Sequence, residues 1–171
     1  MQKNDSITLI GMPGAGKSTL GVQLAKTLAK QFVDTDLLIQ QAVGMSLQQY
    51  LEENGYLALR EQEQQALLSA NLTNAVVSTG GSAVYSEQGM ARLQKLGPCI
   101  YLQVSFQTMQ HRVTNASSRG LAVAEGTTLK DLYTERLPLY ERWATHTVNC
   151  DEQSQAAILQ KIEQLLLNSM G

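Results

Sequence analysis

The stretch ITLIGMPGAGKST, residues 7–19, decides the fold of this chain. It opens with ITLI, three apolar residues and a threonine, which predict a short buried strand, and continues with G-x-x-x-x-G-K-S from Gly11 to Ser18. Leucines then recur every four residues through 17–30, which predicts a helix. A strand, a glycine-rich turn and a helix in this order form a phosphate-binding loop. The stretch therefore predicts a site for a nucleoside triphosphate.

Each residue type in this loop has a chemical reason to be there. Glycines let successive backbone N–H groups turn inward and surround an anion, and the start of a helix adds its positive dipole end. The Lys17 ammonium can reach the β- and γ-phosphates, and the Ser18 hydroxyl can ligate Mg²⁺. The predicted cofactors are therefore ATP and Mg²⁺. The predicted nucleotide-binding residues of the loop are Gly14, Ala15, Gly16, Lys17, Ser18 and Thr19.

The rest of the chain alternates short apolar runs with amphipathic segments. The predicted strands are 7–11, 32–36, 75–81, 99–104 and 146–150. The predicted helices are 17–30, 46–54, 57–71, 86–96, 105–114, 129–143 (kinked or interrupted at Pro138) and 154–168. Five repeats of strand and helix favour a parallel sheet covered by helices on both faces, that is, a three-layer α/β/α fold. We expect one domain, residues 1–171.

Composition excludes several classes of protein. Hydrophobic residues make up 43% of the 171 residues, which is too many for a disordered chain, and the net charge of −2 argues against a general nucleic-acid binder. The two cysteines form no C-x-x-C motif, so we expect buried free thiols in a reducing compartment. No apolar run approaches ~20 residues, and the N-terminus lacks the pattern of a signal peptide. We expect a cytoplasmic monomer with no membrane or nucleic-acid partner.

Two carboxylates follow the second predicted strand. Asp34 and Asp36 are separated by one residue, and alternation along a strand would point both toward the ligand crevice at the carboxyl edge of the sheet. In this arrangement Asp34 would hold Mg²⁺, directly or through water. Asp36 would orient and deprotonate a substrate hydroxyl.

Three arginines and a glycine pair lie in positions that suit a phosphoryl-transfer site. Arg119 falls in a glycine-bearing loop, about 114–127, that we interpret as a lid. Arg60 could bind a substrate carboxylate while Glu63, one helical turn later, holds its guanidinium in place, and Arg136 could be a second carboxylate clamp. Residues 80–81 are both glycine after the third strand, so a small ligand could lie against their backbone.

Taken together, these pieces resemble the shikimate kinase family of small P-loop kinases. The resemblance runs from the loop to the last strand. Its matching segments are 11–18, 34–36, Gly55 through Arg60 to Glu63, 78–81, Arg112 with Arg119, and ERLPLY at 135–140. The order and spacing of the set are more specific than any single member except the loop.

The resemblance implies a sheet order of 2-3-1-4-5 and ATP-dependent phosphorylation of a hydroxyl of shikimate. It implies a substrate-binding region at about 34–63. The implied catalytic residues are Lys17, Asp36 and Arg119, and Ser18 and Asp34 are the implied metal ligands. The implied substrate contacts are Asp36, Arg60, Gly80, Gly81 and Arg136, and Arg112 would pack on the adenine. Two alternatives stay open: a kinase of another small acid, sugar acid or nucleotide, and a non-catalytic ATP-binding module.

The chain departs from the family pattern at four positions. Ser82 stands where a third glycine is usual, and Gly120 follows Arg119 where proline is usual. Leu59 replaces the common aromatic before Arg60, and Tyr56 replaces the usual acid after Gly55. These changes keep the charged set but predict an altered pocket shape and a more mobile lid.

Overall fold

The computed structural model describes residues 5–115 and 121–168. Five parallel strands form one sheet, in the order β2-β3-β1-β4-β5. The strands are β1 (Ile7–Ile10), β2 (Gln31–Asp34), β3 (Ala75–Ser78), β4 (Cys99–Gln103) and β5 (His146–Asn149). The helices are α1 (Lys17–Leu28), α2 (Thr35–Val43), α3 (Leu47–Ser69), the 3₁₀ turn η1 (Ala83–Tyr85), α4 (Glu87–Leu96), α5 (Phe106–Asn115), α6 (Leu129–Trp143) and α7 (Gln155–Asn168). The fold class and strand order predicted from the sequence are confirmed.

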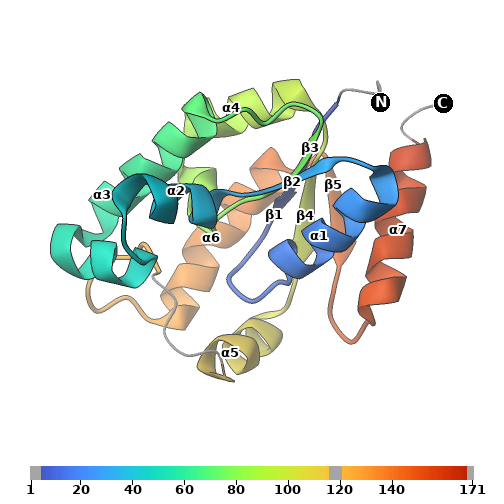
Figure 1. The fold of residues 1–171 in the computed structure, drawn as a ribbon. Coiled ribbons are helices and arrows are strands. Elements are labelled where there is room, and N and C mark those ends of the chain that lie inside the picture. Colours follow the sequence, from blue (N-terminus) through green and yellow to red (C-terminus); the bar gives the residue numbers. More distant parts are fainter. Residues whose placement is uncertain (1–4, 116–120, 169–171) are drawn as a thin grey trace.

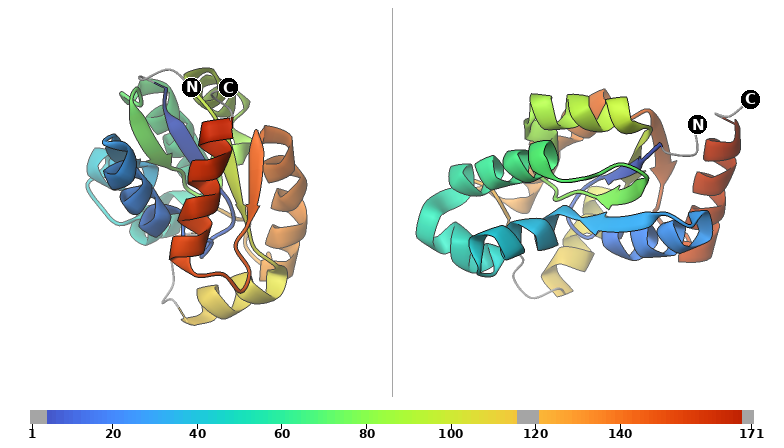
Figure 2. Two further views of the ribbon diagram at one scale, coloured as in Figure 1. Left: turned by 90° about the vertical axis from the view of Figure 1, so that its right-hand side faces the viewer. Right: turned by 45° about the horizontal axis from the view of Figure 1, so that its top comes forward.

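Helices cover both faces of this sheet (Figure 1). On one face, α1 packs against β2 and β3, and α7 packs against β5 and α1. On the other face, α6 packs against β4, and α3 packs against α4 (Figure 2). All residues of β1 and β3, and the first four of β4, are buried, whereas β2 and β5 at the edges are partly exposed. The continuous apolar runs of the sequence therefore form the centre of the sheet, as burial on both faces requires.

The sequence prediction was wrong about the end of the second strand. It extended that strand to Asp36, but β2 ends at Asp34, and Thr35 begins α2, a helix that was not predicted. Asp34 is the N-cap residue of α2, and its Oδ1 accepts a hydrogen bond from the backbone N–H of Asp36 at 2.9 Å. A carboxylate that satisfies an otherwise unpaired amide favours helix initiation, and this preference prevails over the apolar run before it.

Two further segments differ from the prediction in detail. The helices predicted at 46–54 and 57–71 form one element, α3, that bends sharply at Gly55, whose φ of 83° and ψ of 170° are not helical. Helix α6 continues through Pro138 to Trp143, so of the predicted kink or interruption at this proline the interruption is wrong. Buried Leu132, Tyr140 and Trp143 lie on both sides of the proline, and their packing offsets the backbone hydrogen bond that the proline removes.

Within the described residues, no helix is long and apolar enough to cross a membrane.

Candidate active site

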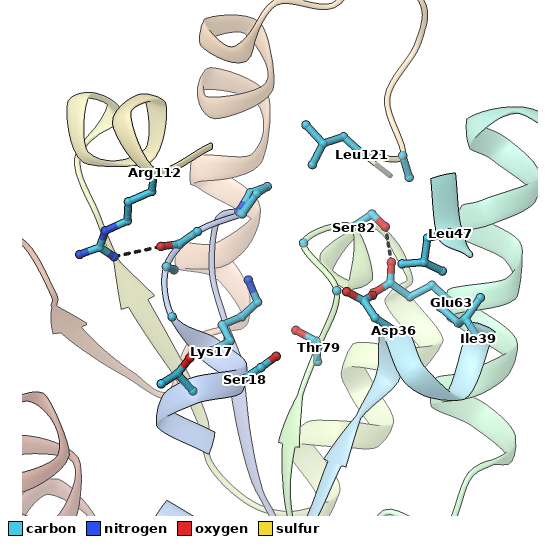
Figure 3. A pocket seen from close by; sticks show the side chains of 18 of the residues that line it. Lys17, Ser18, Asp36, Ile39, Leu47, Glu63, Thr79, Ser82, Arg112 and Leu121 are labelled. Atoms are coloured by element: carbon cyan, nitrogen blue, oxygen red, sulfur yellow. Dashed lines mark hydrogen bonds between the residues drawn. The ribbon is translucent and has the colours of Figure 1, made fainter. Parts of the chain in front are cut away.

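The glycine-rich loop connects β1 to α1 and opens into a cavity of about 850 Å³. Gly14 and Gly16 have φ values of +77° and +91°, which side chains with a Cβ rarely adopt. Helix α1 begins at Lys17 and has no acidic residue of its own in the first turn, so its positive dipole end faces the loop. Figure 3 shows the loop along one side of the cavity. The predicted residues Gly14 to Thr19 all line it.

Lys17 is buried at the base of the loop. Its Nζ donates to the backbone carbonyls of Gly11 at 2.8 Å and Met12 at 2.9 Å. Burial lowers the pKa of the Lys17 ammonium to about 8, and the Asp36 carboxylate acts against this shift. An ammonium at the start of the helix that has lost part of its hydration binds a strong anion well. Phosphate oxygens replace the lost water contacts and favour the charged form of the lysine.

Nucleotide binding should therefore take up protons above pH 8. At pH 8.5 most Lys17 side chains in the free protein are neutral, and the phosphates of ADP, whose own pKa lies near 6, should raise the Lys17 pKa. We expect an uptake of roughly 0.5–0.7 proton per bound nucleotide. Calorimetric titration in two buffers with different ionisation enthalpies measures it, and Lys17→Met should abolish it. A binding enthalpy that is equal in both buffers would contradict this assignment.

The Ser18 hydroxyl lies between two strand ends. Its Oγ donates to Oδ2 of Asp34 at 2.7 Å and is 3.1 Å from Oγ of Ser78. The Asp34 carboxylate thus reaches the phosphate loop through one oxygen while the other caps α2. Hydroxyl and carboxylate oxygens are the donors that Mg²⁺ prefers, so Ser18 and Asp34 fit the metal that a triphosphate would bring. The prediction that Asp34 lies close to the phosphate loop is correct, but alternation of side chains along a strand is not the reason.

Asp36 lies on the opposite side of the cavity, in the first turn of α2 (Figure 3). A Cβ on Gly80 would lie 2.9 Å from Asp36 Oδ1, so the carboxylate sits directly against the backbone that follows β3. The backbone N–H of Gly80 donates to Oγ1 of Thr35 at 3.0 Å, a contact that fixes this approach. The cavity therefore has phosphate-binding groups on one side and a carboxylate on the other.

Arg136 reaches the same region from α6. Its side chain is 1% exposed, and neither Nε nor Nη2 has a hydrogen-bond partner among the described residues. The hydroxyl of Tyr140 donates to the Gly81 carbonyl at 2.6 Å, and a Cβ on Gly81 would lie 2.5 Å from Nη1 of Arg136. The glycine therefore leaves room for a buried guanidinium that presents N–H donors to an anion.

Arg112 is on the phosphate-loop side of the cavity. Its Nη1 donates to the Gly14 carbonyl at 2.9 Å, and its side chain lines the cavity next to residues 153–158. This position, beyond the loop and away from Asp36, suits the predicted contact with a nucleotide base (Figure 3).

Arg60 is not held as predicted. Its guanidinium stacks 3.7 Å from the Tyr85 ring centroid, and its Nη2 is 4.0 Å from Oε1 of Glu135. Its Nε donates to the Ala122 carbonyl at 3.2 Å, so it lies at the rim of the cavity rather than along its wall. Glu63 bonds the Ser82 hydroxyl instead, and the predicted pairing of Glu63 with Arg60 is therefore wrong. The remaining predicted arginine, Arg119, lies outside the described residues.

A sequence model of the shikimate kinase family matches residues 13–167. The chain belongs to the shikimate kinase family. It is 35% identical over 164 residues to the shikimate kinase of Paracidovorax citrulli, with 92% of this chain and 89% of the relative covered. It is 32% identical to that of Vibrio parahaemolyticus, with 97% and 98% covered.

Solved structures agree with this membership. The shikimate kinase of Acinetobacter baumannii in complex with shikimate superposes with a TM-score of 0.86 at 30% identity, with 96% of this chain and 94% of that one covered. The enzyme of Aquifex aeolicus gives a TM-score of 0.81 at 28% identity, with 96% and 98% covered. As a member of this family the chain is a kinase that uses ATP.

Several residues that shape this shikimate kinase site were not identified from the sequence. Tyr140 holds the Gly81 carbonyl through its hydroxyl, and Thr35 anchors the backbone N–H of Gly80. Leu59 and Ala122 pack with Ile39 in a small cluster beside the cavity. The N-cap signal at Asp34 could have revealed α2 and Thr35, but the contacts of Tyr140 and Ala122 join segments distant in sequence, and no local pattern marks them.

Proposed function

We propose that this chain transfers the γ-phosphoryl group of ATP to a hydroxyl of shikimate, giving shikimate 3-phosphate and ADP. Buried Arg136 is the observation that supports the substrate best, because it has two nitrogens without a hydrogen-bond partner among the described residues and lines the same cavity as the phosphate loop and Asp36. A small molecule that carries a carboxylate and hydroxyls matches this pattern of donors and acceptors. The shikimate complex of the Acinetobacter baumannii relative adds direct support for that class of ligand.

The positions of the individual residues support the following proposed roles. Gly14 to Thr19 bind the phosphates, and Arg112 packs on the adenine. Ser18 and Asp34 would hold Mg²⁺, which would neutralise charge on the phosphates of the nucleotide. Arg136 binds the substrate carboxylate, joined by Arg60 from the rim. The backbone of Gly80 and Gly81 lines the substrate.

In the reaction, the accepting hydroxyl oxygen bonds to the γ-phosphorus as the bond from that phosphorus to the bridging oxygen of ADP breaks. Asp36 aligns the hydroxyl and receives its proton. Lys17 stabilises the negative charge that develops on the leaving phosphate. Arg119, in the predicted lid, covers the transferring phosphoryl group. Covering the site excludes water and so suppresses hydrolysis of ATP. The enzyme works as a monomer in the cytoplasm.

An acceptor panel tests this function. ADP release should be fast with ATP, Mg²⁺ and shikimate, and at least 100-fold slower with quinate, gluconate, a nucleoside monophosphate or no acceptor, because only shikimate satisfies all contacts together. Release that does not depend on an acceptor would identify an ATPase or a nucleotide sensor. ADP release with another acid, but not with shikimate, would support the reaction type and show that the acceptor is that other acid.

A further inference from the structure

Glu63 is a buried acid with a hydrogen-bond partner for only one of its two carboxylate oxygens. It lies on the inward stripe of α3 between Leu59 and Leu67, four residues from each, and is 3% exposed. Its Oε2 accepts a hydrogen bond from the Ser82 hydroxyl, whereas its Oε1 has no hydrogen-bond partner among the described residues. A buried carboxylate oxygen without a partner is costly, so its retention calls for an explanation in the ligand-bound protein.

The unpartnered oxygen lies next to Asp36. A Cβ on Gly80 would overlap Glu63 Oε1 and would lie 2.9 Å from Asp36 Oδ1, so both oxygens converge on one side of the Gly80 backbone. Figure 3 shows the two carboxyl groups side by side, with Ser82 bound to the far oxygen of Glu63. Both acids line the cavity where the acceptor molecule must lie.

Charged and titratable groups surround Glu63 on several elements. Burial raises its pKa to about 7, with Asp36 acting in the same direction, and the Ser82 hydrogen bond, Arg136 and Lys17 opposing it. Tyr140 faces the group from α6. At pH 8 the carboxylate is ionised, and an ionised oxygen in this position can only accept a hydrogen bond.

Ser82 is the feature of this chain that orients the acid. Its hydroxyl donates to Oε2 of Glu63, the acid that the sequence predicted to hold Arg60. Arg60 is held instead by Tyr85, Glu135 and the Ala122 carbonyl. Oε1 of Glu63 therefore stays buried beside the cavity without a hydrogen bond from Arg60.

We propose that Ser82 is a positioning residue that binds one oxygen of Glu63 and turns the other toward Asp36, which gives the site a second carboxylate acceptor for a substrate hydroxyl. Asp36 receives the hydroxyl that is phosphorylated, and Glu63 Oε1 accepts a hydrogen bond from a hydroxyl on a neighbouring carbon. The inference rests on the proposed function, because it requires an acceptor with adjacent hydroxyls.

The test compares shikimate with its 4-deoxy and 5-deoxy analogues at pH 8, using wild type, Ser82→Ala, Ser82→Thr and Glu63→Gln. For shikimate we expect Ser82→Ala to raise KM about tenfold with kcat changed less than threefold, and Ser82→Thr to restore most of the loss. For the 4-deoxy analogue, wild type and Ser82→Ala should have equal kcat/KM, because the hydroxyl next to the phosphorylated 3-hydroxyl, which Glu63 would bind, is missing. The 5-deoxy analogue should keep the penalty of Ser82→Ala. Glu63→Gln should lose discrimination against the 4-deoxy analogue.

Two results would overturn the inference. An equal penalty of Ser82→Ala on all three acceptors would make the serine a merely structural residue, and unchanged KM in Ser82→Ala would remove its role altogether. Thermal melting of each variant separates misfolding from these outcomes, and Ser82→Thr keeps the test valid if the alanine variant is unstable. Failure of wild type to phosphorylate shikimate would instead refute the proposed function.

Discussion

Replacing Asp36 by asparagine should lower kcat for shikimate phosphorylation about 1,000-fold. The carboxylate lies across the cavity from the phosphate loop and against the Gly80 backbone, where it can take the proton of the accepting hydroxyl. An amide of the same size can still orient the hydroxyl, but it cannot take the proton. Coupled measurement of ADP release gives kcat. Calorimetric titration with ADP gives the nucleotide affinity, which should change far less than kcat because Asp36 acts on the loop only through its charge on Lys17.

Asp131→Asn is the matched control for this variant. It makes the same chemical change at an acid in the first turn of a helix, but Asp131 is exposed on α6 and its carboxylate is bound to Thr128. We expect its kcat to stay within twofold of wild type, apart from a small loss of stability from the weakened cap. A loss below tenfold in Asp36→Asn, or a parallel loss of ADP affinity, would show that Asp36 is not the base.

The sequence could predict those parts of this protein that depend on interactions between residues close together in the chain. The loop needs glycines, a lysine and a serine at fixed spacing, so residues 11–18 were sufficient to predict the strand, turn and helix that the structure contains. The central strands are short apolar runs because they are buried on both faces, and this pattern gave the sheet class. The strand order came from the family resemblance rather than from any local pattern.

The errors at Asp34 and Arg60 have different physical origins. At Asp34 a local signal was present but was outweighed: the residue ends an apolar run and also caps a helix, and the cap determines the backbone from Thr35 onward. At Arg60 the local signal is incomplete: helical spacing brings the Tyr56 ring centroid within 5.0 Å of its guanidinium, but it does not identify the hydrogen-bond partner. Helical spacing turns Glu63 inward and Arg60 toward η1 and α6, and the partners that then hold these two side chains lie 19 residues from Glu63 and 62 residues from Arg60. Such contacts follow from tertiary packing alone.

Arg136→Met should weaken shikimate binding and stabilise the free protein at the same time. The substrate carboxylate would lose its buried guanidinium partner, so KM for shikimate should rise at least 100-fold, on the order of 3 kcal/mol. The free protein should gain about 1–4 kcal/mol, because a buried cation with two unpartnered nitrogens is replaced by an apolar side chain of similar length. Its neighbours are not left orphaned, since Tyr140 donates to Gly81 and Tyr85 donates to Glu135.

Arg142→Met, one turn and a half further along α6, provides the control. Arg142 is exposed, pairs with Glu87 at 2.7 Å and lies outside the cavity wall formed by the described residues, so its loss should change stability by less than about 1 kcal/mol and leave KM unchanged. Urea unfolding without substrate measures the stability of both variants, and initial rates measure KM. The two effects of Arg136→Met must occur together, because one cause underlies both: two nitrogens of the guanidinium are kept buried without a partner among the described residues so that the substrate carboxylate can pair with them. A variant that loses both substrate and stability would mean that Arg136 holds the fold together, and the carboxylate site would have to be sought at Arg60.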